Sequence, residues 1–205
     1  MGQHANKMGN VNLKTAWIFP GQGSQYIGMG RDLYEKSELA KKLYKIAEDI
    51  LEFDIKSIVF EGHEDLLNKT KYTQPSIYIT SVILGKILID KGIKPYAVAG
   101  HSLGEYSALT ISNSISFEKG LKLVKARAEN MDAAGNLIKG TMAAIVGLSE
   151  EEVQLICSSY QDKEIVVIAN INSPRQIVVS GTQDGVFDVI EKSKKSGAKL
   201  AIELK

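Results

Sequence analysis

The residues best suited to chemistry lie at positions 100–104, where Gly-His-Ser-Leu-Gly has the spacing Gly-x-Ser-x-Gly. An apolar run at 96–99 predicts a buried strand before this segment, and a helical pattern follows at 103–110. A serine at a sharp strand-to-helix turn is a nucleophile elbow, and the flanking glycines avoid steric clashes there. We therefore predict Ser102 as a nucleophile and the Leu103 N–H as an oxyanion donor, with a purely structural turn as the alternative.

A second loop, Gly-Gln-Gly-Ser-Gln at positions 21–25, also follows an apolar run, which spans 15–19 and predicts another buried strand. Two such strands in one parallel sheet would bring their following loops to the same edge. An oxyanion hole needs a second N–H from a different loop, and the Gln22 backbone could supply it. The loop lacks the Gly-Lys-Ser/Thr of a phosphate-binding loop, so the remaining alternative is a plain turn.

Arg127 lies in a helical pattern at 117–133, downstream of the serine. On a helical wheel it falls within about 40–60° of Met131 and Val124, which belong to the apolar face. The guanidinium would therefore flank the buried face, and this planar cation can bind a carboxylate in a bidentate manner. The alternative is a surface arginine whose aliphatic stem covers apolar neighbours.

A serine nucleophile needs a general base, usually a histidine, and the sequence offers His4, His63 and His101. His4 belongs to a polar leader at 1–14, and His63 lies in a charged segment at 61–65 that predicts a solvated loop. His101 is adjacent to the serine, and neighbouring side chains diverge at a sharp elbow, so it would be a poor base. No histidine follows position 101.

Strands and helices alternate along the first part of the sequence. Helical periodicity covers 38–51 and returns at 73–90, where we expect Pro75 in the first turn and Gly92 just past the end. Such alternation predicts a mostly parallel sheet with helices on both faces.

The pattern changes after Gly135. Strands are expected at 142–146, 165–171, 176–179 and 199–204, a turn at 173–175, and helices from Ser149 (a capping box with Glu152) and over 183–196. The order βαββαβ is ferredoxin-like. The predicted organisation is a disordered leader (1–14), a large α/β domain (15–136) and a ferredoxin-like subdomain (137–205).

The composition is that of an ordinary globular protein of 205 residues, 44% of them hydrophobic. A formal net charge of +1 gives no electrostatic footprint for nucleic acid. The only cysteine, Cys157, excludes an internal disulfide and is expected to fill space in a helix. No run approaches the roughly 18 apolar residues of a membrane span, and the start lacks a signal-peptide core. These features predict a soluble cytoplasmic protein with neither a nucleic-acid nor a membrane partner.

Several segments together resemble one family. They are FPGQGSQ (19–25), TQPS (73–76), GHSLGEYSAL (100–109), GTMAAIVGL (140–148) and NINSPRQIVVSG (170–181). In this order they are similar to malonyl-CoA:acyl-carrier-protein transacylases and to the acyltransferase domains of fatty acid and polyketide synthases. The similarity extends from about residue 15 to residue 205.

The resemblance implies a hydrolase-like parallel-sheet domain with an inserted ferredoxin-like subdomain. Ser102 would attack the thioester of malonyl-CoA, while the N–H groups of Gln22 and Leu103 hold the oxyanion. The malonyl group would then pass to the phosphopantetheine thiol of acyl carrier protein, as in ping-pong covalent catalysis.

The resemblance also implies a specificity residue. Arg127 would bind the acyl carboxylate and favour malonyl or methylmalonyl over acetyl, and His101 and Met131 would line the pocket. We expect no metal and no cofactor, since malonyl-CoA is a substrate, and a monomer at full length.

In the resembled family the catalytic histidine follows soon after the last strand of the small subdomain, where this sequence ends at Lys205. We therefore expect a C-terminally truncated chain that lacks the rest of the large domain and turns over slowly, if at all. Within the family the alternative is a trans-acting polyketide acyltransferase. Outside it the alternatives are a serine thioesterase or hydrolase, against which Arg127 and the loop at 21–25 argue, and a non-catalytic carrier-binding scaffold.

Overall fold

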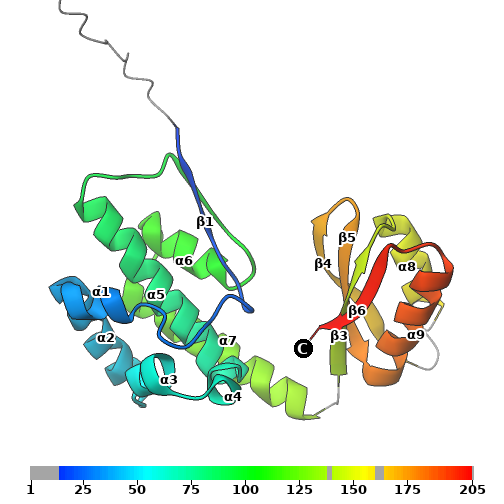
Figure 1. The fold of residues 1–205 in the computed structure, drawn as a ribbon, viewed down its shortest axis with the longest axis horizontal. Coiled ribbons are helices and arrows are strands. Elements are labelled where there is room, and N and C mark those ends of the chain that lie inside the picture. The colour runs from blue at the N-terminus through cyan, green and yellow to red at the C-terminus, as the bar shows by residue number, and fades with distance from the viewer. Residues whose placement is uncertain (1–13, 138–139, 160–163, 205) are drawn as a thin grey trace, which may run out of the picture. The chain divides into compact units, whose positions relative to one another are not determined.

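The computed structural model describes residues 14–137, 140–159 and 164–204. They belong to two compact units, Met1–Asp132 and Ala133–Lys205 (Figure 1). The leader predicted at 1–14 therefore lies outside the described residues except for Lys14. The division between the units falls inside one long helix.

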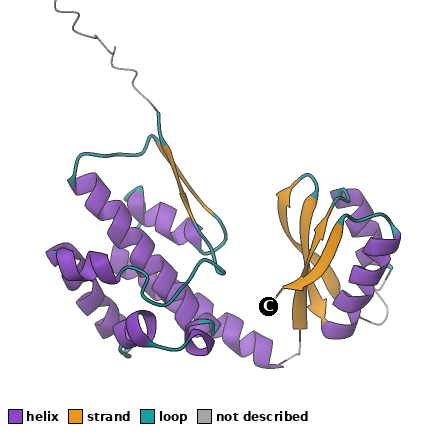
Figure 2. Cartoon of the chain, viewed as in Figure 1, coloured by secondary structure: helices purple, strands orange, loops and turns teal. Residues whose placement is uncertain are grey.

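Helices make up most of the first unit, and the strands are gathered mainly in the second (Figure 2). Through the long helix they are β1 (Ala16–Phe19), α1 (Arg31–Lys36), α2 (Glu38–Leu51), α3 (Ile55–Glu61), α4 (Glu64–Leu67), α5 (Thr70–Asp90), β2 (Ala97–Gly100), α6 (Gly104–Ile111) and α7 (Phe117–Leu137). The remaining elements are β3 (Gly140–Val146), α8 (Glu150–Ser158), β4 (Val166–Ser173), β5 (Gln176–Thr182), α9 (Gln183–Lys195) and β6 (Leu200–Leu204).

Strands β1 and β2 pair in parallel, with Phe19 opposite Gly100 at their carboxyl ends. This confirms both predicted strands to within a residue, as well as their parallel pairing. The pairing brings the loop after β1 and the turn after β2 to one sheet edge, because parallel strands end on the same side.

The expectation that these strands are buried between two helical layers is wrong for the described residues. Phe19 is 6% exposed, whereas its neighbour Ile18 is 77% exposed. The covered face is the one that carries Trp17, since a Cβ built on Gly85 of α5 would touch both Trp17 and Ile111 of α6. Helices α5 and α6 thus meet on one face of the sheet, and an apolar run in the sequence cannot reveal which face lacks a cover.

Helix α5 begins at Thr70, three residues before the predicted start, so Pro75 lies in its second turn and not in its first. The expectation that its missing N–H costs nothing is therefore wrong, because that turn loses one helical hydrogen bond. The early start follows from Thr73, whose hydroxyl donates to the carbonyls of Leu67 (2.5 Å) and Lys69 (3.1 Å). These bonds join α5 to the short helix α4.

Helix α5 forms the centre of the first unit. Its buried residues lie all around its circumference, as expected for a helix surrounded by other elements. The Tyr78 hydroxyl is bonded to Thr110 Oγ1 of α6 (2.8 Å) and donates to the Phe117 carbonyl at the start of α7 (2.9 Å). A single phenol therefore joins three helices, and burial raises its pKa to about 12.

The second unit has the predicted order βαββαβ, in a four-stranded antiparallel sheet ordered β4-β5-β3-β6. Helices α8 and α9 cover one face, where Ala143 and Ile145 are fully buried, while Ile202 on the opposite face is 46% exposed. The predicted capping box of Ser149 and Glu152 is present. The ferredoxin-like prediction is therefore confirmed in element order and topology.

Cys157 lies in α8 and is buried in the core of the second unit, as expected of a space-filling thiol. Burial raises the pKa of this thiol, which disfavours the reactive thiolate. Although α5 has 21 residues, no helix within the described ranges combines the length and apolar character required to cross a bilayer.

Replacing Tyr78 with Phe should lower the free energy of unfolding by about 1–2 kcal/mol, because two buried hydrogen bonds are lost. A raised folded-state pKa means that the contribution of Tyr78 is complete below its ordinary pKa of about 10 and disappears as the pH rises toward 12. Urea denaturation at pH 8 and pH 11 measures both effects. Tyr26→Phe, at a 65% exposed position, is the matched control, and equal losses in the two variants would contradict the assignment.

Candidate active site

The turn between β2 and α6 has the backbone of a nucleophile elbow. Ser102 has a φ of 52°, in the left-handed region that residues with a side chain seldom adopt. A Cβ on Gly100 would lie 2.0 Å from the Gly104 carbonyl carbon, and a Cβ on Gly104 would lie 2.1 Å from the Phe19 carbonyl oxygen. Both glycines are therefore required by the close approach of backbone to backbone.

The loop at 21–25 lies against this elbow. A Cβ on Gly21 would be 2.7 Å from the His101 carbonyl oxygen, and the His101 N–H donates to the Phe19 carbonyl at 3.0 Å. Within the loop, the Ser24 hydroxyl donates to the Gly21 carbonyl at 2.8 Å. The two segments that were predicted to share a sheet edge are thus in contact.

Two backbone donors belong to these adjoining segments. Within the described ranges, the N–H groups of Gln22 and Leu103 donate to no protein acceptor. Leu103 is itself fully buried and precedes the first residue of α6, where helical N–H groups lack internal partners. The arrangement suits a ligand oxygen that would accept from both loops.

Arg127 reaches Ser102 from helix α7. Its Nη2 donates to the Ser102 Oγ at 2.9 Å, and its Nη1 donates to the Oε1 of Gln74 at 2.6 Å. The side chain is half-buried, so it is neither a core residue nor a solvated surface arginine. The structure thereby places a permanent positive charge directly beside the serine hydroxyl.

The Arg127 contact leaves the serine proton available. Because a guanidinium can only donate, the Ser102 oxygen is the acceptor and its O–H is not consumed. An arginine also stays protonated in proteins, so it cannot remove that proton. A general base must therefore be a different group.

The structure describes two of the three histidines, and they lie in different segments. His63 is exposed at the N-cap of the short helix α4, so it is solvated as predicted but adjoins a helix that the sequence did not indicate. The ring of His101 lies against Gly21, whose added Cβ would be 3.0 Å from Nδ1. His4 lies outside the described residues. Within the described ranges no group of three His, Cys, Asp or Glu side chains comes together at metal-binding distance.

Gln74 is a site residue that sequence reasoning did not single out. It is fully buried, and its Nε2 donates to the Met131 sulfur at 3.2 Å, in addition to the bond from Arg127 to its oxygen. Met131 is 46% exposed and thus lies at the rim of this cluster. The signal available in the sequence was the segment at 73–76, where Thr, Gln and Ser stand near the start of an otherwise largely apolar helix.

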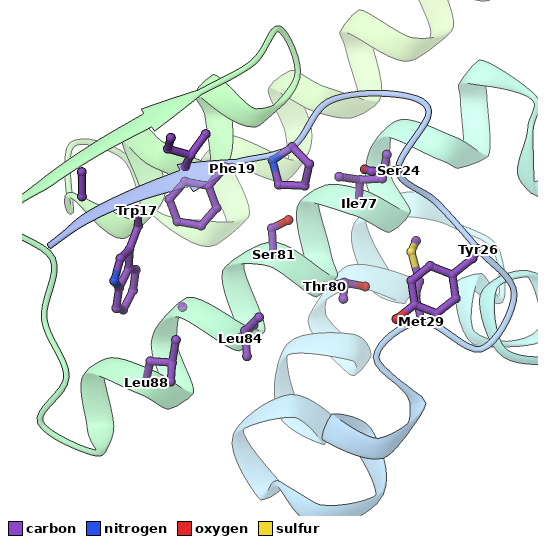
Figure 3. A pocket seen from close by; sticks show the side chains of 14 residues that line it. Trp17, Phe19, Ser24, Tyr26, Met29, Ile77, Thr80, Ser81, Leu84 and Leu88 are labelled. Carbon is purple, nitrogen blue, oxygen red and sulfur yellow. The ribbon is translucent and has the colours of Figure 1, made fainter.

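An apolar cavity of about 460 Å³ lies between β1 and α5, beside the loop that follows β1 (Figure 3). Trp17 and Phe19 of β1 face Thr80 and Leu84 of α5 across it. Neither Ser102 nor Arg127 lines this cavity. Within the described residues, the cavity therefore lies along the edge of β1 that pairs with no other strand. It does not lie where Ser102, Arg127 and Gln74 converge.

The parallel strands, the left-handed serine after β2 and the adjoining glycine loop define an α/β protein with a nucleophile elbow. The chain belongs to the acyl transferase domain family, whose pattern it matches over residues 16–204.

Curated relatives agree with this family. The chain is 42% identical over 192 residues to the malonyl CoA-acyl carrier protein transacylase of Bacillus subtilis, with 93% of this chain and 61% of the relative covered. It is 44% identical over 193 residues to the protein of that name from Synechocystis, with 94% and 62% covered. The chain thus spans about three-fifths of the length of these relatives.

Solved structures confirm the mixed α/β fold. The malonyl CoA-acyl carrier protein transacylase from Coxiella burnetii superposes with a TM-score of 0.87 at 35% identity, covering 93% of this chain and 61% of that one. A malonyl-transacylase in complex with a type II PKS acyl-carrier protein gives a TM-score of 0.85 at 36% identity, with 94% and 62% covered.

Replacing Gly104 with Ala should destabilise the first unit by about 3 kcal/mol, because the new methyl group would overlap the Phe19 carbonyl. Gly135→Ala is the matched control, since α7 leaves open space around that position and alanine is the better helix former by up to ~1 kcal/mol. In thermal denaturation, the Tm should fall for Gly104→Ala and rise for Gly135→Ala. If Gly104→Ala melts like the unmodified protein, the elbow is not packed as described.

Proposed function

We propose that this protein accepts a malonyl group from malonyl-CoA on Ser102 and transfers it to the phosphopantetheine thiol of acyl carrier protein. The observation that carries the proposal is the contact of 2.9 Å between Arg127 Nη2 and Ser102 Oγ. A malonyl carboxylate is separated from the thioester carbonyl by a single methylene group. A cation within hydrogen-bond distance of the nucleophile therefore suits this acyl group.

The first half of the reaction forms an ester. Ser102 Oγ attacks the thioester carbonyl of malonyl-CoA, the hydroxyl proton passes to a general base, and the C–S bond breaks to release the thiol of CoA. The oxyanion of the tetrahedral intermediate would accept from the N–H groups of Gln22 and Leu103. Such donors commonly contribute several kcal/mol of transition-state stabilisation.

The second half regenerates the serine. The phosphopantetheine thiol attacks the malonyl ester, the C–O bond breaks, and the serine oxygen regains a proton. Both halves use the same oxyanion donors, which is the basis of ping-pong transfer. In support, a structural neighbour is a malonyl-transacylase in complex with an acyl-carrier protein.

Arg127 would decide which acyl groups are accepted. A guanidinium binds a carboxylate through two parallel N–H···O bonds, and a lysine offers no such planar pair. An acetyl group would leave this half-buried cation without an anionic partner. Arg127 also argues against a simple esterase or thioesterase, which needs no cation next to its nucleophile.

Fatty acid synthesis is the proposed pathway, and a trans-acting polyketide acyltransferase would use the same chemistry. We also propose a cytoplasmic location. Its support is the single cysteine of the chain, which is buried and cannot form an internal disulfide.

Replacing Ser102 with Ala should abolish the covalent malonyl adduct, because it removes the oxygen that attacks the thioester. Intact-protein mass spectrometry after brief exposure to malonyl-CoA measures the adduct directly. Ser107→Ala, in the following helix α6, is the matched control and should still be acylated. An adduct that persists in the Ser102 variant would contradict the proposal.

Replacing Arg127 with Ala should lower kcat/KM for malonyl-CoA by about 100-fold, equivalent to ~2–3 kcal/mol for a partly buried charge-assisted pair. Acylation by acetyl-CoA should be unchanged or faster. Lys125→Ala removes another cation from the same helix, one that pairs with Glu52 instead, and should leave the ratio unaltered. Equal losses with both acyl donors would refute the role of Arg127 in selectivity.

A further inference from the structure

We propose that Gln74 is a positioning residue for acyl selectivity: its buried carboxamide holds the Arg127 guanidinium in the orientation that receives the acyl carboxylate. The inference rests on the proposed function. It extends that function to a side chain that does not contact the nucleophile. Gln74 is fully buried, so it does not reach the open side of the site either.

Gln74 differs from the buried polar side chains next to it. Thr73 and Ser76 are also buried, but each hydroxyl donates to a carbonyl four residues earlier in the chain, Lys69 at 3.1 Å and Tyr72 at 2.6 Å. Both hydroxyls bond to nearby backbone carbonyls, including that of Leu67 for Thr73, and need no side-chain partner from another helix. Gln74 is bonded instead to side chains of α7, more than fifty residues away, so its polarity serves that contact.

The orientation of the Gln74 amide follows from its partners. Arg127 has only donors, so the atom facing its Nη1 at 2.6 Å must be the amide oxygen. The amide nitrogen then faces the Met131 sulfur at 3.2 Å, which is a weak acceptor. Since Gln74 is fully buried, water does not compete for the strong bond to the guanidinium.

Two hydrogen bonds hold the guanidinium, one at each of its terminal nitrogens, Nη1 and Nη2. Gln74 takes one N–H of Nη1 and Ser102 takes one N–H of Nη2. Of the five N–H groups of an arginine, about three therefore remain for a carboxylate. A side chain already held in place loses less conformational entropy on binding, which favours the dicarboxylic acyl group.

The helix that carries Gln74 is itself tied to α7. One turn further along α5, Tyr78 donates to the Phe117 carbonyl at the start of α7. Bonds from Gln74 and Tyr78 thus connect the same two helices at separate points. The amide is therefore mounted on a rigid support and not on a loop.

Gln74→Met tests this role, because methionine keeps the side-chain length but accepts only weakly. We expect KM for malonyl-CoA to rise about tenfold, with kcat/KM for acetyl-CoA unchanged. Ser76→Ala, which removes a locally satisfied hydroxyl from the same helix, is the matched control and should alter neither. Equal losses for both acyl donors in Gln74→Met would indicate a general structural role and overturn the proposal.

A double-mutant cycle separates positioning from packing. If Gln74 acts through Arg127, Gln74→Met should have no further effect on the malonyl-to-acetyl ratio once Arg127 is replaced by Ala. Additive effects in the double variant would overturn the proposal.

A measurement on the unmodified protein covers the case in which Gln74→Met does not fold. Side-chain ¹⁵N NMR of Arg127 should show resolved Nη protons, because a held guanidinium rotates slowly, and one averaged signal would overturn the proposal. If the unmodified protein forms no malonyl adduct, the proposed function fails while this signal still reports the bond. If the adduct forms with undiminished selectivity in Gln74→Met, only the positioning role fails.

Discussion

The close approach of the Phe19 carbonyl to Gly104 is the contact on which the site depends. It places the end of β1 against the start of α6, and Ser102, in the turn between β2 and α6, adopts a φ of 52°. Such a conformation is costly for a residue with a side chain, so the surrounding backbone must impose it. In return, the serine hydroxyl projects from the turn, and the Leu103 N–H is left beside it at the helix start.

Helices far apart in sequence also converge on the serine. Helix α5 supplies the buried amide of Gln74, and α7 supplies Arg127, whose guanidinium bridges that amide and the Ser102 oxygen. Rigid elements therefore carry both the charge and its support, while the N–H groups proposed as oxyanion donors come from adjoining turns. This division suits acyl transfer, in which the charge that develops must meet donors already in place.

The sequence predicts the features that depend on local spacing and misses those that depend on distant neighbours. The elbow at Ser102 is encoded by glycines two residues away, and the capping box at Ser149 by a glutamate three residues later. In contrast, the exposure of Ile18 depends on which sheet face the helices cover, and the early start of α5 depends on the chain that precedes it. Local spacing does not indicate the role of Gln74, because its partner lies on another helix.

A crystal structure of the protein trapped after reaction with malonyl-CoA tests the central claim most directly. We expect a malonyl ester on Ser102 Oγ, with both carboxylate oxygens about 3 Å from Arg127 nitrogens and the Gln74 oxygen still bonded to Nη1. An ester whose carboxylate points away from Arg127, or an acyl group on another side chain, would contradict it.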